Sequence, residues 1–284
     1  MQSKYITTSR GKFHIKDNEN MDGFPVVMLH GWPESCYCWH HVIPHLTGNW
    51  WIITPDMRGL GDSERTLEKE AYAKDELAKD MLNLLTEMGI TDFYLVGHDW
   101  GCAVAQEMAI LEPARVKKFV LLNMSVIPNE KGNHAAQQFL NQHGNVSAWY
   151  QHFQQMPFLP EAMIEGNEEI WIRFFIRNAK QQPLREDAVQ EYIRCYKIKN
   201  TPLTGANYYR MLRKDIGRWK KLYDHKFTMP SLYIYANQDR VIIPAFIEHV
   251  EDCFESIEIK QIKAGHFVTD EKPEEVAKYM NGFL

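Results

Sequence analysis

The stretch LVGHDWGCAVA, residues 95–105, decides how the rest of the chain is interpreted. Apolar residues lead up to Gly97, and small residues follow Gly101. This order predicts a buried strand, a tight turn and a helix packed close to the strand, because glycine permits backbone geometry and close approach that other residues do not. Asp99 lies at the centre of the turn. It either caps the helix, as aspartate often does, or it is a reactive side chain presented by a strained strand-to-helix turn.

Apolar runs of similar length recur on both sides of this stretch. They cover residues 24–31, 50–57, 92–99 and 116–126 and, after a long gap, residues 231–239 and 256–265. Segments with helical spacing lie between them, such as residues 75–88, and a last helix is expected to begin at Pro273. This alternation predicts an α/β fold with a mostly parallel sheet and helices on both faces.

The alternation stops between residues 127 and 221, where aromatic and polar residues with helical spacing replace the strand-like runs. We therefore predict an α/β core made of residues 1–126 and 222–284, interrupted by a helical cap of residues 127–221. The cap is expected to lie over the carboxyl ends of the strands, where open α/β sheets bind their ligands.

The composition and net charge of the chain indicate which kinds of binding partner are not expected. The 284 residues carry a net charge of −5, which does not favour nucleic acid or an anionic membrane as a partner. The N-terminus lacks the apolar region of a signal peptide, and no run approaches a membrane span. The five cysteines, with Cys36 and Cys38 one residue apart, match no zinc or redox motif. We expect a cytoplasmic protein with reduced thiols and neither metal nor cofactor, and we leave its oligomeric state open, with a homodimer as one alternative.

Two other residues form a set with Asp99. Asp239 ends the run 231–239, and His266 follows the run 256–265 directly after Gly265. Alone, the first would be an ordinary turn residue and the second a solvated loop histidine. Together, in the order nucleophile, acid, histidine and each at the end of a predicted strand, they indicate one hydrolytic site.

A fourth element of this site is the segment HGWPES, residues 30–35, which follows the first apolar run. The backbone N–H groups of Trp32 and of Trp100, the residue after Asp99, can point at one spot and stabilise a developing oxyanion there. The Trp32–Pro33 bond is a candidate cis peptide, because bonds that precede proline tolerate the cis form.

Taken together, these motifs resemble those of the α/β-hydrolases, in the branch of the epoxide hydrolases and haloalkane dehalogenases. The resemblance covers nearly the whole chain and rests on HGWPES, DMRGLGDS (56–63), GHDWG (97–101), NQD (237–239) and GH (265–266). It implies an α/β-hydrolase fold with an inserted helical cap. A carboxylate in place of serine implies attack on a saturated carbon, because the alkyl ester so formed is a good intermediate whereas an acyl anhydride is not. His266, oriented by Asp239, would then activate the water that hydrolyses the ester.

The leaving group distinguishes the two activities of this branch. An epoxide oxygen leaves as an alkoxide and needs proton donors. The segment WYQHFQQMP (149–157) resembles the first tyrosine motif of epoxide hydrolases, and TGANYYRML (204–212) resembles the second. The resemblance implies Tyr150 and Tyr209 as the donors, with Tyr208 as an alternative by register. The alternative without a catalytic role is that these tyrosines only fill the core of the cap.

The resemblance therefore implies an epoxide hydrolase whose partners are a small apolar epoxide and water. Aromatic residues crowd the expected cap, which favours an apolar substrate. Substrate contacts are expected from five residues: His30, Trp32, Trp100, Phe153 and Tyr208. The alternative is a haloalkane dehalogenase with the same triad; Trp100 is compatible with it, but Trp32 stands where that family commonly has asparagine. A third alternative is a ligand receptor of the same fold with little turnover.

Overall fold

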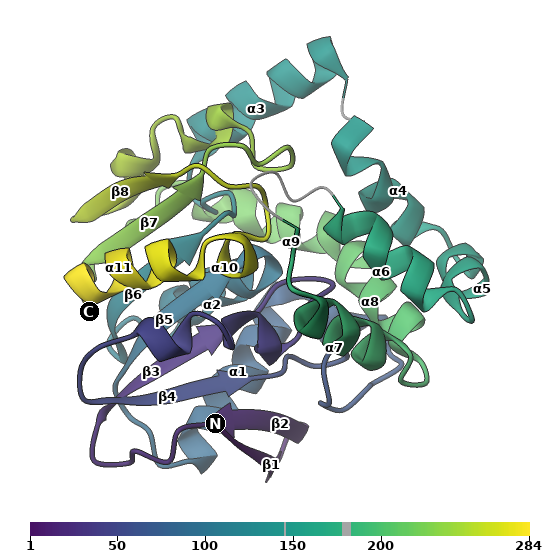
Figure 1. Ribbon diagram of the computed structural model, residues 1–284. Helices are drawn as coiled ribbons and strands as arrows, with labels where there is room; N and C mark the ends of the chain where they lie inside the picture. Colours follow the sequence, from purple (N-terminus) through teal and green to yellow (C-terminus); the bar gives the residue numbers. More distant parts are fainter. Residues whose placement is uncertain (145, 178–182) are drawn as a thin grey trace.

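The computed structural model describes residues 1–144, 146–177 and 183–284 (Figure 1). Its centre is one eight-stranded sheet with the order β1-β2-β4-β3-β5-β6-β7-β8. The strands are β1 (Gln2–Thr8), β2 (Gly11–Asp17), β3 (Phe24–Leu29), β4 (Trp50–Pro55), β5 (Phe93–His98), β6 (Val116–Leu122), β7 (Ser231–Ala236) and β8 (Ile257–Ile262). The pairs β1–β2 and β2–β4 are antiparallel, and from β4 to β8 every pair is parallel.

The six apolar runs of the sequence are confirmed as the six parallel strands, each a few residues shorter than predicted. The N-terminal hairpin of β1 and β2 was not predicted. Strand β1, QSKYITT, alternates exposed and half-buried residues at the edge of the sheet and contains no continuous apolar run. An antiparallel edge strand with one solvated face has this pattern, which is weak beside the buried runs of the parallel strands.

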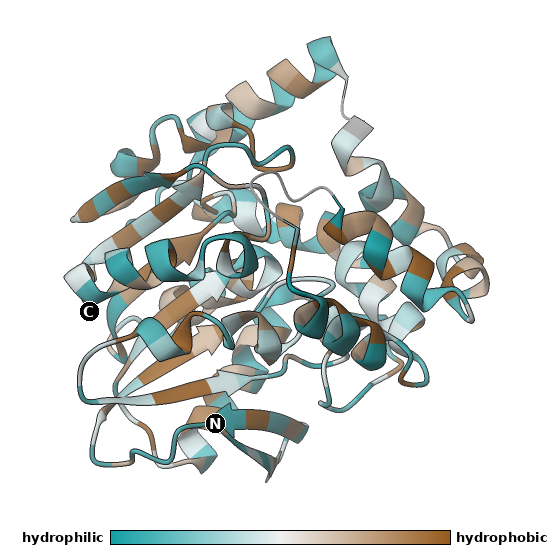
Figure 2. Ribbon diagram, viewed as in Figure 1, coloured by the Kyte–Doolittle hydropathy of each residue, from teal (hydrophilic) through white to brown (hydrophobic). Residues whose placement is uncertain are grey.

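Helices α1 (Lys74–Glu87), α2 (Asp99–Leu111), α10 (Val268–Glu271) and α11 (Pro273–Phe283) flank the sheet (Figure 1). The helix predicted at 75–88 and the helix start predicted at Pro273 are both confirmed. Figure 2 shows the hydrophobic residues concentrated in the central strands and the hydrophilic residues on the surrounding helices and loops.

Between β6 and β7 the described part of the chain forms helices and no strand. They are α3 (Glu130–His143), α4 (Trp149–Gln155), α5 (Leu159–Ile164), α6 (Glu168–Ile176), α7 (Glu186–Tyr196), α8 (Thr201–Arg210) and α9 (Leu212–Trp219). We call α3–α9 the inserted helices. Figure 1 shows α4 to α8 gathered beside the sheet.

Two ion pairs with buried carboxylates attach the end of this insertion to the sheet-flanking helices. Lys74 Nζ on α1 lies 3.1 Å from Asp215 Oδ2 on α9, and both side chains are almost fully buried. The guanidinium of Arg218 on α9 lies 2.9 Å from the buried carboxylate of Glu107 on α2. The first pair fixes α9 against α1, and the second fixes it against α2, the helix that begins at Asp99.

Among the described residues, no helix is both long and apolar enough to cross a membrane. The Trp32–Pro33 peptide is cis, as the sequence suggested. All five cysteines are buried free thiols.

Candidate active site

Asp99 begins helix α2 directly after β5, with a positive φ of 47°. An L-residue rarely adopts this backbone conformation, and such strain concentrates at functional sites. Its Oδ1 accepts a 2.8 Å hydrogen bond from the N–H of Trp32 in the loop after β3. Gly31 makes this approach possible, because a Cβ on Gly31 would lie 2.6 Å from the Cβ of Asp99. One oxygen of the Asp99 carboxylate is thus held by a backbone N–H group.

The structure places His266 between the carboxylates of Asp99 and Asp239. His266 Nε2 lies 3.1 Å from Asp99 Oδ2, and its Nδ1 lies 2.7 Å from Asp239 Oδ2. Asp239 also accepts hydrogen bonds from the side chain of Asn123 at 2.8 Å and from the N–H of Val241 at 2.7 Å. Asp239 is therefore held in one orientation by groups at the ends of β6 and β7.

The two carboxylates set the protonation state of this cluster. Burial alone would lower the pKa of His266, but the charge and hydrogen bond of Asp239 and those of Asp99 raise it well above the usual value. Burial would raise the pKa of Asp99, but its hydrogen bond to His266 and the charges of His266 and His98 bring it below the usual value. At neutral pH the resting cluster is therefore an imidazolium between two carboxylates.

A second buried histidine–carboxylate pair supports the first and was missed in the sequence. His98 Nδ1 lies 2.9 Å from Glu34 Oε2, and its Nε2 donates to the backbone carbonyl of His266 at 2.8 Å. Glu34 also accepts the N–H of Gly31 at 2.9 Å. Burial would lower the pKa of His98, but Glu34 raises it above the usual value. This pair connects the loops that carry Trp32, Asp99 and His266. The signal was present as the glutamate of HGWPES and the histidine of GHDWG.

Tyr150 on α4 and Tyr209 on α8 meet beside these residues. The ring of Tyr150 stacks on that of Trp32, with the planes 1° apart and the centroids 5.6 Å apart. The ring of Tyr209 contacts those of Trp32, Trp100 and Tyr150 edge-on, with centroids 5.1, 5.4 and 5.6 Å away. Burial and the nearby charge of Asp99 raise the pKa of both phenols, so they remain protonated at neutral pH.

Tyr208, the neighbouring residue on α8, lies elsewhere. Its hydroxyl donates to the backbone carbonyl of Arg58 at 2.8 Å, and its ring packs on Tyr72. The two adjacent tyrosines point from α8 in different directions. The sequence left open which of them is the second proton donor, and Tyr209 is the one whose ring contacts Tyr150.

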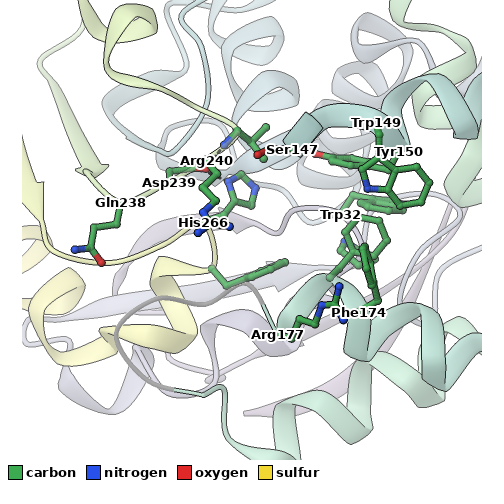
Figure 3. A pocket seen from close by; sticks show the side chains of 14 residues that line it. Trp32, Ser147, Trp149, Tyr150, Phe174, Arg177, Gln238, Asp239, Arg240 and His266 are labelled. Atoms are coloured by element: carbon green, nitrogen blue, oxygen red, sulfur yellow. Dashed lines mark hydrogen bonds and ion pairs between the residues drawn. The ribbon is translucent and has the colours of Figure 1, made fainter. Parts of the chain in front are cut away.

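A cavity of about 220 Å³ adjoins this cluster (Figure 3). It is lined by Trp32, Pro33, Ser147, Trp149, Tyr150, Phe174, Phe175, Arg177, Gln238, Asp239, Arg240, Val241, His266 and Phe267. Most of these are aromatic or aliphatic, with polar groups near His266. The inserted helices therefore supply much of the wall opposite the catalytic candidates.

The structure places some predicted substrate contacts outside this lining. His30 is fully buried; its Nδ1 bonds to the carbonyl of Gly31 at 2.8 Å, and its Nε2 accepts the N–H of Met57 at 3.0 Å. Phe153 packs against Trp149 and Trp171. Trp100 is buried in the first turn of α2 against Tyr209 rather than in the wall. Of the predicted contacts, only Trp32 lines the cavity.

Several buried polar atoms around Trp32 have no hydrogen-bond partner of ordinary geometry among the described residues. They are the indole N–H groups of Trp32, Trp100 and Trp171, the hydroxyl of Tyr196 and the amide of Gln154. Burial raises the pKa of Tyr196, while nearby polar groups of Trp171, Trp32 and Gln154 oppose this effect. Because buried polar groups are normally paired, this donor-rich region can accept an oxygen atom or an anion.

One group of side chains has the composition of a metal site. His14, Cys36 and Asp56 place their ligand atoms within 4.8 Å of one another. Asp56 is already bonded to His14 Nδ1 and to the N–H of Cys36, both at 2.7 Å. Burial raises the pKa of the Cys36 thiol well above its usual value, which disfavours the thiolate that binds metals. We therefore assign no metal role to this group.

Comparisons with known proteins agree with this architecture. Residues 25–273 match the family model described as alpha/beta hydrolase fold. A soluble epoxide hydrolase of Corynebacterium sp. (strain C12) is 29% identical over 89% of this chain and 87% of its own length. A bifunctional epoxide hydrolase 2 of Sus scrofa is 27% identical over 92% of this chain, which spans only 51% of that relative.

Among solved structures, wild-type Cfl2 from Burkholderia cenocepacia matches with a TM-score of 0.86 and 29% identity, over 99% of this chain and 95% of that one. The family model covers most of the chain, and the mostly parallel eight-stranded sheet is consistent with it. This chain belongs to the α/β-hydrolase fold family.

Proposed function

We propose that this protein is an epoxide hydrolase, which opens an apolar epoxide to a vicinal diol through a covalent alkyl ester on Asp99. The observation that carries the proposal is the carboxylate on the strained turn, bonded to the N–H of Trp32 and to His266, with two buried phenols meeting over the ring of Trp32. The names of the Corynebacterium and Sus scrofa relatives support the same activity.

In the first step, a carboxylate oxygen of Asp99 attacks one epoxide carbon and the carbon–oxygen bond of the ring breaks. The leaving oxygen gains negative charge and takes a proton from Tyr150 or Tyr209, whose raised pKa keeps them protonated beforehand. Tyr150 and Tyr209, whose ring centroids lie 5.6 Å apart, would both donate to this oxygen and stabilise the charge where it develops. Preorganised donors contribute most in a site shielded from water.

The protonated state of His266 balances the proton count. Alkylation turns Asp99 into a neutral ester, so His266 loses one of the two charges that raise its pKa. Its proton then returns the tyrosinate to phenol, which leaves His266 neutral and able to act as a base. The first step thereby prepares the second.

In the second step, neutral His266 takes a proton from water, and the hydroxide attacks the carbonyl carbon of the Asp99 ester. The N–H groups of Trp32 and Trp100 stabilise the oxyanion, and Asp239 stabilises the imidazolium. Collapse of the intermediate releases the diol and restores the Asp99 carboxylate beside protonated His266. The inserted helices, as the predicted cap of residues 127–221, supply both tyrosines and the apolar wall that holds the substrate.

A haloalkane dehalogenase is the second candidate, favoured by one observation. The buried indole N–H groups of Trp32 and Trp100 have no partner among the described residues, and such donors suit a departing halide. The two phenols, which a halide does not require, make the epoxide the better match.

The test compares the turnover of styrene oxide with that of a primary bromobutane by the wild type and by the variants Tyr150→Phe and Tyr209→Phe. Each change removes one hydroxyl and little volume. Each should slow epoxide opening by about ten- to a thousand-fold, by analogy with losing one oxyanion donor, and the double variant should nearly abolish it. Diol formation and bromide release are measured in parallel.

Any bromoalkane activity should be much less affected, because bromide leaves without a proton. Equal losses on both substrates would mean that the tyrosines only shape the cavity. A fast wild-type reaction with bromobutane and none with epoxides would establish the dehalogenase instead, and no turnover of either would favour a ligand receptor.

A further inference from the structure

A second set of nucleophile, base and acid lies at the N-terminal hairpin, outside the site described above. Ser3 Oγ on β1 lies 2.7 Å from His14 Nε2 on β2, and His14 Nδ1 lies 2.7 Å from Asp56 Oδ2 in the loop after β4. The three side chains form one hydrogen-bonded chain with the order of a Ser-His-Asp triad, an arrangement defined by geometry and not by sequence position. None of the three lines the cavity beside His266.

The carboxylate of Asp56 decides which ring nitrogen of His14 carries a proton. Burial would raise the pKa of Asp56, but the hydrogen bond from His14 and the nearby charges of His30 and His14 lower it to about 2. An ionised carboxylate only accepts hydrogen bonds, so Nδ1 of His14 donates to it. In the neutral imidazole Nε2 then holds the lone pair, and the Ser3 hydroxyl donates to it. This is the tautomer that a general base requires.

The base and the acid are buried, whereas the serine is exposed. His14 and Asp56 are almost fully covered, and Asp56 also accepts the N–H groups of Cys36 at 2.7 Å and of Asp62 at 2.9 Å. Ser3 is exposed on β1, the strand at the edge of the sheet (Figure 1). A reagent in solution can therefore reach the hydroxyl, while the groups that activate it are held in place.

A cation accompanies these groups on the same face of the hairpin. Lys16 is the direct cross-strand partner of Ser3 and lies two residues from His14, so the three side chains leave the hairpin on one side. Directly opposite residues place their Cβ atoms about 5 Å apart. The Lys16 ammonium lies 5.3 Å from the ring centroid of Tyr37. It can stabilise negative charge that develops on a group bonded to Ser3.

We propose that Ser3, His14 and Asp56 form a second nucleophilic site, at which Ser3 takes the acyl group of an activated aryl ester and Lys16 stabilises the oxyanion. Ser3 Oγ bonds to the acyl carbon, His14 Nε2 takes the hydroxyl proton, and the bond to the phenolate breaks; the proton on His14 leaves with the phenolate. Neutral His14 then takes a proton from water, and the hydroxide attacks the acyl carbon. The bond to Ser3 breaks, and the proton returns from His14 to the Ser3 oxygen. This activity is independent of the proposed epoxide hydrolase reaction at Asp99.

The experiment treats the Asp99→Asn variant with para-nitrophenyl acetate, because this variant lacks the proposed epoxide nucleophile and keeps the hairpin. Tandem mass spectrometry of the N-terminal peptides follows acetylation of Ser3 and separates it from that of the terminal amine. Ser9 is the internal control, since it is an exposed serine in the turn of the same hairpin whose hydroxyl donates to Asn83 at 3.2 Å. Ser3 should be acetylated at least about a hundredfold faster than Ser9, the usual effect of a general base.

Substitutions separate the roles within the hairpin. His14→Gln should slow acetylation of Ser3 by about a hundredfold or more. Lys16→Gln should slow it by about tenfold, whereas Lys12→Gln, which removes an exposed cation opposite Thr7, should leave it unchanged. In the wild-type background, Ser3→Ala should remove the acetyl group at position 3 and keep the rate with styrene oxide.

Two results would overturn the second site. One is a Ser3 that reacts no faster than Ser9, a comparison that needs no substitution in the hairpin. The other is an unchanged Ser3 rate in a His14→Gln protein that circular dichroism shows to be folded. Equal rates in Lys16→Gln and Lys12→Gln would remove Lys16 from the account. None of these results bears on the reaction at Asp99, which the epoxide assays test separately.

Discussion

At the scale of single residues, the account depends on how the charge of Asp99 controls His266. The imidazole lies 3.1 Å from Asp99 and 2.7 Å from Asp239, so the two carboxylates share one proton donor. The base of the second step must be neutral, whereas the resting imidazole is protonated. Converting the Asp99 carboxylate into an ester resolves this conflict, because it removes a negative charge beside the ring.

Asp99→Asn imitates the neutral ester and tests this coupling. The pKa of His266 should be lower in the variant than in the wild type, because one of the two charges that favour the imidazolium is gone. The raised pKa means that wild-type His266 keeps its proton as the pH rises past about 6.5, the usual value for histidine. Titration by NMR of ring-labelled histidine measures both proteins, with His266→Gln identifying the resonance. An unchanged pKa in Asp99→Asn would show that the two side chains are not coupled.

A second prediction for a single residue concerns the charge of Asp239. Asp239→Asn keeps the shape of the side chain but removes the charge that stabilises the imidazolium. Ester hydrolysis should slow by at least about a hundredfold, and more than alkylation does, because charge separation is greatest when His266 takes a proton from water. Stopped-flow tryptophan fluorescence can separate the two phases, with Trp32 and Trp100 close to Asp99. Asn123, which donates to Asp239 at 2.8 Å, supplies the control Asn123→Ala, with a smaller effect on hydrolysis. Equal slowing of both phases by Asp239→Asn would place the needed charge elsewhere.

At the scale of elements, the inserted helices must be attached firmly enough to hold two tyrosines over Trp32. Lys74 is buried on α1, pairs with Asp215 on α9, and donates to the backbone carbonyl of Tyr208 at 2.5 Å. Its ammonium also lies 4.1 Å from the ring centroid of Trp100. One side chain thus touches α8, α9 and the residue after Asp99.

Lys74→Met should destabilise the fold by about 3–5 kcal/mol, because it leaves the Asp215 carboxylate buried without a counter-charge. Lys74→Met combined with Asp215→Leu should recover much of the loss, since no buried charge remains. Urea unfolding measures all three proteins. The exposed pair of Lys131 and Asp252 is the control, and Lys131→Met should have little effect. A double variant as unstable as the single one would show that packing, rather than charge, joins α9 to α1.

The burial of each element explains whether it could be predicted from the sequence. The parallel strands are buried on both faces, so each is a continuous apolar run that can be recognised without its neighbours. The edge strand β1 lacks such a run. Pairs such as Lys74 with Asp215 join residues 141 positions apart, and no local pattern relates them.

At the scale of the whole molecule, the parts of the site that could be predicted are those that the sheet itself positions. Asp99, Asp239 and His266 each follow a strand, and the carboxyl ends of parallel strands meet at one edge. Glu34 and His98 lie in the same motifs, but they meet across 64 residues only when two loops are folded. The choice between Tyr208 and Tyr209 depends on the orientation of α8, which the strand pattern does not constrain.

The central claim is that the oxygen delivered to the substrate comes from Asp99 and not directly from water. The measurement is a single turnover of styrene oxide by excess wild-type enzyme in oxygen-18 water, followed by mass spectrometry of the diol and of the peptide that contains Asp99. The account predicts an unlabelled diol and one heavy oxygen in the Asp99 carboxylate, because water attacks the carbonyl carbon of the ester. Heavy oxygen in the first-turnover diol, with an unlabelled Asp99, would contradict it.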